Sequence, residues 1–299
     1  MKQLKPALYK EEGQTILTVS SSLIKKMYFK NMIREDFCNL NFYWCDILKK
    51  CPSISSEAML KGLYFESAIL GSTADGSSVT DLPRHKKTGE KLTDHIRIDE
   101  LIHKWDQYAH LHEIVITKQK EGKNTQLRFS KELQILEIQE HWPGLKVILK
   151  MDTDLISPIK DDEGVFHEGA VIDLKLTGSL DNTFGEYAWG EPERIDHLQA
   201  FIYSYFLELP FFYVVAGIKE GEYKIFPVNT DRNSPYESLA NEANTRYTET
   251  LRSLIDFIDS VMERETRPDL WYLQWPSKSR CKTCVFNHKC KSAQEFKTI

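Results

Sequence analysis

Aliphatic and polar positions follow a strand-like pattern in the middle of the chain. Residues 145–156 and 169–176 are short segments rich in Val, Ile and Leu, and residues 157–164 between them contain Ser, Pro, Asp and Gly. Short aliphatic segments on either side of turn-forming residues are typical of paired strands. The pattern therefore predicts a β-hairpin with a long loop.

The periodicity of apolar residues predicts further elements on both sides of this hairpin. We expect helices at 18–29, 55–70, 95–119, 193–209 and 235–265, and strands at 126–129, 133–139, 211–217 and 222–228. Residues 71–94 are rich in Gly, Ser, Thr and Asp, which predicts a mobile loop.

The order of these elements predicts the α/β fold class, with a mixed central β-sheet flanked by helices. We expect one domain over residues 1–299, with its core at 55–230. Residues 18–54 and 235–299 would form a helical, cysteine-rich cap on this core.

Charged residues are predicted to share one face of the hairpin. Side chains alternate along a strand, so Asp173 and Lys175 point one way and Ile172, Leu174 and Leu176 point the other. Carboxylates bind hard cations, and a lysine can orient water or neutralise developing charge. These are the groups that metal-dependent phosphodiester cleavage needs.

A second carboxylate comes from the preceding strand, where Asp154 can join Asp173. Asp152 lies two residues earlier, hence on the same strand face, and could take this place. The tripeptide Asp-x-Lys is common by chance, so a solvated hairpin with ordinary surface charges is the simpler alternative.

Two predicted helices carry polar residues at helical spacing. Gly62 and Glu66 are four residues apart, as are Gln199 and Tyr203, so each pair shares a helical face. Glu66 could equally be an exposed helix acid, with Tyr203 in the core and Gln199 a surface amide.

Three cysteines near the C-terminus, Cys281, Cys284 and Cys290, predict a metal site. A C-x-x-C pair brings two thiolates within reach of one metal, and the third cysteine follows closely. Tetrahedral thiolate sites suit zinc and iron–sulfur clusters alike, and His288 could complete a zinc site. Free reduced thiols are the alternative without a metal.

Together these features resemble the PD-(D/E)xK nuclease superfamily, in particular its RecB-like and Cas4-like exonuclease branch with a restriction-endonuclease-like core. In that branch an Asp on one strand precedes (D/E)-x-K on the next, which matches Asp154, Asp173 and Lys175. Leu155 and Ile156 follow Asp154, like the apolar residues that usually follow the family Asp.

The other family motifs are matched in the same order. Gly62 and Glu66 fit G-x-x-x-(H/E), with Glu where many relatives have His. Gln199 and Tyr203 resemble the Q-x-x-x-Y motif on the helix after the catalytic lysine. The resemblance implies that these side chains line the site.

The resemblance implies a metal-dependent DNA exonuclease. Asp154, Asp173 and Glu66 would bind Mg²⁺ or Mn²⁺, and the carbonyl oxygen of Leu174 could also coordinate the ion. Lys175 would position the attacking water. DNA, as single strands or duplex ends, would be the partner, and recombination or repair proteins are further candidate partners. A non-catalytic DNA-binding or assembly module, with a structural zinc or iron–sulfur site, is the rival from another class.

In the same branch a single N-terminal cysteine joins the C-terminal three around a [4Fe-4S] cluster. The candidates are Cys38, Cys45 and Cys51. Cys38 is preferred because residues 38–44 resemble the family segment C-P-x-x-(F/Y)-x-(F/Y), although Asn39 replaces the Pro. Cys51 precedes a Pro but lies very close to Gly62.

The bulk composition limits the remaining choices. The formal net charge of −5 is not that of a purely electrostatic nucleic-acid binder, although basic residues can gather locally. The segment 278–291, with five Lys and Arg residues and no acid, is one such group. The first residues do not show the apolar pattern of an export signal. We also find no apolar segment of the roughly 20 residues that span a bilayer. We therefore expect a cytoplasmic location, in a bacterium or a phage-infected cell, with cysteines as thiols or ligands.

Overall fold

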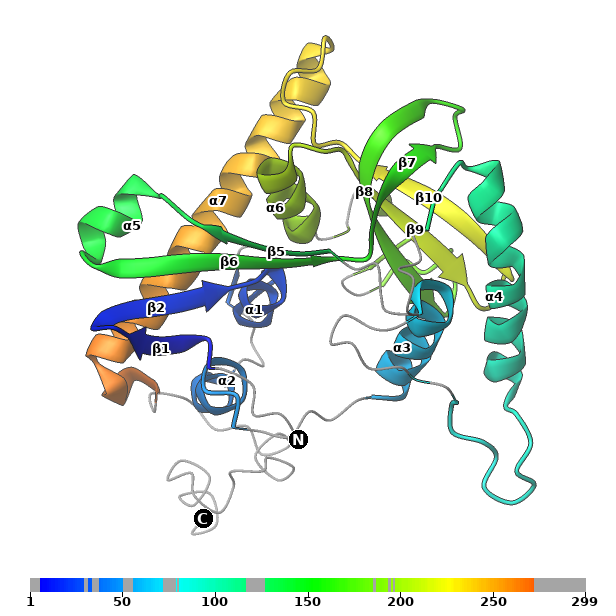
Figure 1. Cartoon of the computed structure of the whole chain (residues 1–299), viewed down its shortest axis with the longest axis horizontal. Coiled ribbons are helices and arrows are strands. Elements are labelled where there is room, and N and C mark those ends of the chain that lie inside the picture. Colours follow the sequence, from blue (N-terminus) through cyan, green and yellow to red (C-terminus); the bar gives the residue numbers. More distant parts are fainter. Residues whose placement is uncertain are drawn as a thin grey trace. The chain divides into compact units, whose positions relative to one another are not determined.

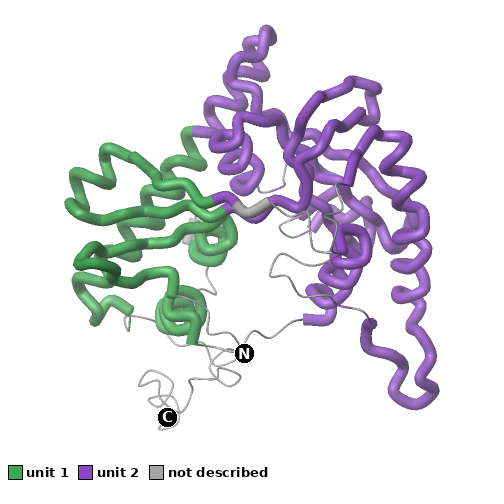
Figure 2. The backbone as a smooth tube through the Cα atoms, in the orientation of Figure 1, with its two compact units in different colours: residues 1–53, 130–150, 248–299 green, residues 54–129, 151–247 purple. Residues whose placement is uncertain are grey.

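The structure, a computed structural model, describes residues 6–29, 32–33, 38–50, 56–71, 79, 81–116, 127–184, 187–192, 195 and 197–271. The chain forms two compact units (Figure 2). The first contains residues 1–53, 130–150 and 248–299, and the second contains residues 54–129 and 151–247.

The second unit is built on a four-stranded mixed sheet of order β10-β9-β8-β7 (Figure 1). β7 (Leu155–Lys160) is antiparallel to β8 (Phe166–Thr177), which is parallel to β9 (Phe211–Gly217). β10 (Glu222–Val228) is antiparallel to β9. Parallel neighbours need a crossover, and helix α6 (Leu198–Leu207) provides it between β8 and β9.

The hairpin differs from the prediction in its turn. Residues 157–160 belong to β7, and the turn covers only residues 161–165. Pro158 is tolerated within the strand because β7 is an edge strand, with a bulge between Ser157 and Ile159. The predicted first strand is also divided, because one residue, Asp154, separates the end of β6 (Leu145–Thr153) from the start of β7.

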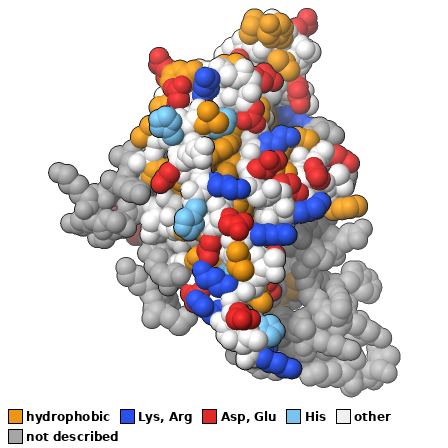
Figure 3. Space-filling view, turned by 90° about the vertical axis from the view of Figure 1, so that its right-hand side faces the viewer, with side chains coloured by type: hydrophobic (Ala, Val, Ile, Leu, Met, Phe, Trp, Pro, Cys, Tyr) orange, Lys and Arg blue, Asp and Glu red, His pale blue; other side chains and the backbone are white. Residues whose placement is uncertain are grey.

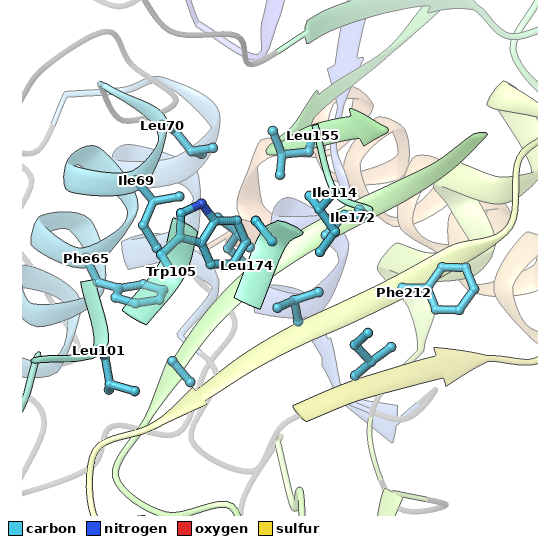
Figure 4. Close-up of a cluster of buried hydrophobic side chains, with 14 of the residues drawn as sticks. Phe65, Ile69, Leu70, Leu101, Trp105, Ile114, Leu155, Ile172, Leu174 and Phe212 are labelled. Atoms are coloured by element: carbon cyan, nitrogen blue, oxygen red, sulfur yellow. The ribbon is translucent and has the colours of Figure 1, made fainter. Parts of the chain in front are cut away.

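Two helices cover one face of this sheet. Helix α3 (Glu57–Leu70) and helix α4 (Thr93–Leu111) pack their apolar side chains against β7, β8, β9 and β10. Figure 4 shows Phe65 of α3 and Trp105 of α4 among Ile172, Leu174 and other buried side chains of the strands. This cluster is the hydrophobic core of the second unit.

Local signals explain where α3 begins and ends. The Ser56 hydroxyl accepts a hydrogen bond from the Met59 N–H at 3.2 Å, which is the expected N-cap. Gly71 follows the last turn with φ +90°, a left-handed conformation that glycine adopts at little cost.

The opposite face of the sheet packs on α6. Every residue of β9 is buried, so both faces of this strand are covered, as its continuous apolar sequence indicates. The rings of Tyr203 on α6 and Phe211 on β9 lie 6.1 Å apart. The second unit is therefore a sheet with α3 and α4 on one face and α6 on the other.

The first unit contains a second four-stranded sheet, of order β1-β2-β6-β5. Its strands are β1 (Leu8–Glu11), β2 (Gln14–Val19), β6 and β5 (Leu127–Glu132), and β2 runs parallel to β6. Short elements lie between its strands β2 and β5 in the chain: α1 (Ser21–Met27), the pair β3 (Tyr28–Phe29) and β4 (Met32–Ile33), α2 (Asn39–Phe42) and the π-turn Tyr43–Ile47. The 3-10 turn Pro268–Trp271 follows the sheet.

Helix α7 (Glu237–Thr266) begins in the second unit and continues into the first. In the first unit its Phe257 ring packs edge-on against Phe42 at 6.2 Å. The Trp271 ring stacks on Tyr43 at 4.5 Å. These contacts join the N-terminal segment to the end of the described chain.

The predicted α/β class with mixed sheet and flanking helices is confirmed, but two four-stranded sheets take the place of one central sheet. The predicted core of 55–230 is interrupted, since residues 130–150 belong to the same unit as residues 1–53 and 248–299.

The strand predicted at 133–139 is wrong, because α5 (Leu136–His141) occupies most of it. Leu133 and Ile138 are buried there, whereas Leu136 is exposed, so the apolar residues do not share a strand face.

None of the helices in the described part of the chain has both the length and the apolar composition that crossing a membrane requires.

The core of the second unit predicts unequal effects for two leucines of α4. Leu101 is completely buried and Leu111 is 68% exposed. Leu101→Ala should lower the free energy of unfolding by about 2–5 kcal/mol, because it removes buried methyl groups and leaves a cavity. Leu111→Ala, the matched control, should change it by less than about 0.5 kcal/mol. Urea unfolding followed by circular dichroism measures both, and equal effects would contradict this packing.

Candidate active site

The site begins at the break between β6 and β7, which Asp154 occupies. Its carboxylate Oδ2 accepts a hydrogen bond of 2.7 Å from the Leu174 N–H. Leu155 is paired with Ile172 in the hairpin, so Leu174 is the next β8 residue whose N–H faces β7. The Asp154 side chain thus replaces the strand backbone as the partner of this N–H, and its carboxylate is held against β8.

Strand β8 places Asp173 and Lys175 on the face that α6 covers. Ile172 and Leu174 belong to the core on the opposite face, as strand alternation predicts. The Lys175 ammonium forms an ion pair with Asp173 Oδ2. The Asp173 side chain is 5% exposed and that of Lys175 is 26% exposed, so the lysine is the part of this pair that solvent reaches.

Helix α6 holds the other side of Asp173. The Gln199 side-chain amide donates to Asp173 Oδ1 at 2.8 Å. One turn later, the Tyr203 hydroxyl donates to the backbone carbonyl of Asp152 at 3.1 Å. The helix therefore fixes both the Asp173 carboxylate and the end of β6 that leads into Asp154.

The two candidate aspartates of the first strand have different surroundings. The Asp154 side chain is buried beside Asp173, whereas Asp152 is exposed and bonds to Tyr203 through its backbone carbonyl. The structure thus brings Asp154, rather than the Asp152 carboxylate, to Asp173 and Lys175.

The charge of Glu66 on α3 influences the Asp154 carboxyl. Burial, together with the negative charges of Asp173 and Glu66, raises the pKa of the Asp154 carboxyl well above its usual range. Lys175 and the Leu174 N–H act in the opposite direction. The charge of Glu66 therefore acts on Asp154, and its place among the metal ligands stays a prediction.

Lys175 stays protonated in this environment. Burial acts to lower the pKa of Lys175, but Asp173, Tyr187 and Asp154 raise it, and the result is a pKa above the ordinary lysine value. Its ammonium lies 5.9 Å from the centroid of the Tyr187 ring. A protonated lysine can donate hydrogen bonds and supply positive charge.

Tyr187 lies beside Lys175 in the candidate site, and sequence reasoning missed it. It lies twelve positions after Lys175, within a loop, at no spacing that a strand or helix would fix. An aromatic residue in the loop after β8 was the only signal, and it is a weak one.

The donor set fits a small hard cation. Asp154, Asp173 and Glu66 offer carboxylate oxygens, and one lysine balances only part of their charge. The Leu174 carbonyl leaves β8 on the same side as its N–H, toward Asp154. A carboxylate oxygen has two lone pairs, so Asp173 can accept its present hydrogen bonds and still bind a metal.

Within the described residues, three His, Cys, Asp or Glu side chains do not come close enough together to hold a metal as they stand. Mg²⁺ commonly binds through one or two carboxylates and retains several waters. The pair Asp154 and Asp173 would suit such a site, and Glu66 would act through water.

The predicted cysteine site is only partly visible. Cys281, Cys284, Cys290 and the candidate Cys51 lie outside the described residues. Cys38 Sγ accepts from the Asn41 N–H at 3.4 Å and caps α2. Its assignment as the fourth cluster ligand stays a prediction.

Cys45, in the π-turn, is disulfide-bonded, whereas the sequence favoured thiols or ligands. Cysteines close enough to be bridged are also close enough to share one metal ion.

Charge alone does not mark a nucleic-acid surface on the face shown in Figure 3. Lys and Arg side chains are interspersed there with Asp and Glu side chains. A mixed surface of this kind lacks the continuous positive potential that attracts a polyanion.

Comparison with known proteins does not assign the chain to a family. No protein-family model matches the chain, and no curated protein is significantly similar to it. The likeness to RecB-like nucleases therefore depends on the identity, order and placement of the site residues.

Proposed function

We propose that this protein is a Mg²⁺- or Mn²⁺-dependent DNA exonuclease that hydrolyses phosphodiester bonds by a PD-(D/E)xK mechanism. The observation that carries the proposal is the convergence of Asp154, Asp173 and Lys175, with Gln199 bonded to Asp173. The rival, a non-catalytic DNA-binding or assembly module, needs none of these groups to be buried together. The cost of burying two adjacent carboxylates favours a catalytic use.

The carboxylates would hold the metal at the strand break. Asp154 and Asp173 are fixed by the Leu174 N–H and the Gln199 amide, so their oxygens are oriented before an ion binds. Glu66 would extend the ligand set through water. When bound, the ion supplies a Lewis acid for the phosphate and lowers the pKa of a coordinated water.

Lys175 would act from the solvent-exposed side of the carboxylates. Its ammonium is charged, is tied to Asp173 and is partly accessible, so it can orient the attacking water and balance charge on the phosphate. Gln199 and Tyr203 are positioning residues in this scheme, because they hold Asp173 and the end of β6. DNA as the substrate and attack from strand ends follow from the family resemblance.

Exchange of one buried carboxylate tests the proposal. Asp173→Asn keeps the size of the side chain but removes a metal ligand, so it should reduce DNA cleavage by about a hundredfold or more. Asp152→Asn, a change of an exposed carboxylate two residues before Asp154, should leave cleavage near the wild-type rate. End-labelled linear DNA with Mg²⁺ or Mn²⁺, followed on denaturing gels, measures both.

The same preparations decide between the two function classes. Circular dichroism should show both variants folded, and DNA binding should persist in Asp173→Asn. Unchanged cleavage in Asp173→Asn would reject the site assignment. A wild-type protein that binds DNA with every divalent ion but never cuts it would favour the non-catalytic module.

The raised pKa of Asp154 predicts a pH dependence of stability without metal. Because the pKa is higher in the folded than in the unfolded state, the folded state binds more protons between the two values. The stability contributed by this group is therefore present at low pH and is lost as pH rises through the folded-state pKa. Asp154→Asn keeps an oxygen for the Leu174 N–H and removes the charge, so it should raise the metal-free melting temperature at neutral pH.

Metal binding should reverse the order of the wild-type and Asp154→Asn melting temperatures. Mg²⁺ or Mn²⁺ should raise the melting temperature of the wild type, because it binds the folded state, and should do little for Asp154→Asn. Differential scanning fluorimetry between pH 5 and pH 8, with EDTA or with metal, measures both effects. A metal-free Asp154→Asn protein that melts below the wild type at neutral pH would refute the electrostatic account.

A further inference from the structure

The loop after the catalytic strand is fastened to the sheet at its base. Following β8, the Ser179 hydroxyl and the Leu180 N–H donate to the two carboxylate oxygens of Glu220, at 2.6 and 3.0 Å. Gly217 permits this approach, because a Cβ there would lie 2.4 Å from Glu220 Oε2. The start of the loop therefore has one defined conformation.

A single side chain then holds the exposed part of the loop. The Phe184 N–H donates to Asn182 Oδ1 at 3.2 Å, and the Asn182 amide donates to the Phe184 carbonyl at 2.8 Å. The same amide donates to the Tyr187 carbonyl at 3.1 Å. Both backbone groups of Phe184 are thus fixed, whereas its ring is 79% exposed, the largest value for a large apolar side chain among the described residues.

The Asn182 amide connects this exposed ring with the candidate active site. Tyr187, the other residue that it holds, faces the Lys175 ammonium and stacks on Trp189 at 5.4 Å with an interplanar angle of 12°. Trp189 is buried and anchors the stack. Phe184 is therefore presented from the same hydrogen-bonded turn that positions an aromatic ring beside Lys175.

The chemistry of the loop favours bases over phosphates as its contact. Residues 178–190 contain no Lys or Arg, and Asp181 is exposed beside Asn182. A phosphate would be repelled there, whereas the face of an aromatic ring stacks on any unpaired base. Isolated exposed apolar residues are common, but fixing the backbone under one costs entropy that no burial offsets.

We propose that Phe184 stacks on an unpaired base of the DNA strand entering the site, which makes single-stranded or frayed ends the preferred substrate class. This inference rests on the proposed nuclease function, since it concerns the same site. Lys175 and the metal ligands would act on the phosphate, and Phe184 would fix the adjacent base.

Fluorescence of 2-aminopurine in an oligodeoxythymidylate tests the contact. The full chain is titrated with Ca²⁺ in place of Mg²⁺, since an ion with longer, more flexible coordination favours binding without cleavage. Stacking quenches the probe. Phe184→Ala should weaken binding about tenfold and abolish the quenching, since one stacked base contributes on this scale.

Three further variants separate stacking from other effects. Phe184→Tyr keeps the ring and should behave as wild type, whereas Phe184→Leu keeps an apolar surface without a π-face and should lose the quenching. Tyr236→Ala removes a ring that is 69% exposed elsewhere in the same unit and should change nothing.

Parallel cleavage assays with Mg²⁺ or Mn²⁺ distinguish the two proposals. Cleavage that depends on Asp173, with binding and quenching unchanged by Phe184→Ala, would overturn the base contact and leave the nuclease proposal standing. Phe184-dependent quenching in a wild-type protein that never cuts would support the base contact and overturn the nuclease proposal. A wild-type protein that binds no oligonucleotide would overturn the inference directly.

Discussion

The hydrogen bond from the Leu174 N–H to the Asp154 carboxylate is the interaction on which the site depends. A strand that simply continued from β6 into β7 would pair its backbone with β8 and direct its side chains to alternate faces. The break at Asp154 instead lets a side chain take the place of the backbone. A buried N–H is satisfied, and a carboxylate is fixed beside Asp173 in the same step.

Burying these two carboxylates side by side lowers the stability of the folded protein. Asp154 and Asp173 are both buried, and the raised pKa of Asp154 is the free-energy cost of holding a charge there. Lys175 offsets part of that cost for Asp173. The remaining negative charge favours any cation that binds oxygen ligands, so the same electrostatics that oppose folding would promote metal binding.

Sequence patterns predicted the parts of this fold that depend on burial. β9 was expected at 211–217 because a strand covered on both faces is continuously apolar, and the structure agrees. The strand expected at 222–228 is β10. Alternation correctly placed Asp173 and Lys175 on one face. It could not choose between Asp152 and Asp154, which have the same parity, because the strand break decides this and leaves no periodic signal. Tyr187 was missed because a loop conformation, set by Glu220 and Asn182, brings it to Lys175.

Helix α6 shows why core and site cannot be separated in this protein. It is the crossover that makes β8 and β9 parallel, and Tyr203 packs on Phe211 while its hydroxyl holds the end of β6. Gln199, one turn earlier, reaches Asp173 only because that packing fixes the rotation of the helix about its axis. The interpretation of Tyr203 as a core residue and the proposal that it supports the site are therefore compatible, since its ring packs on Phe211 and its hydroxyl holds the end of β6.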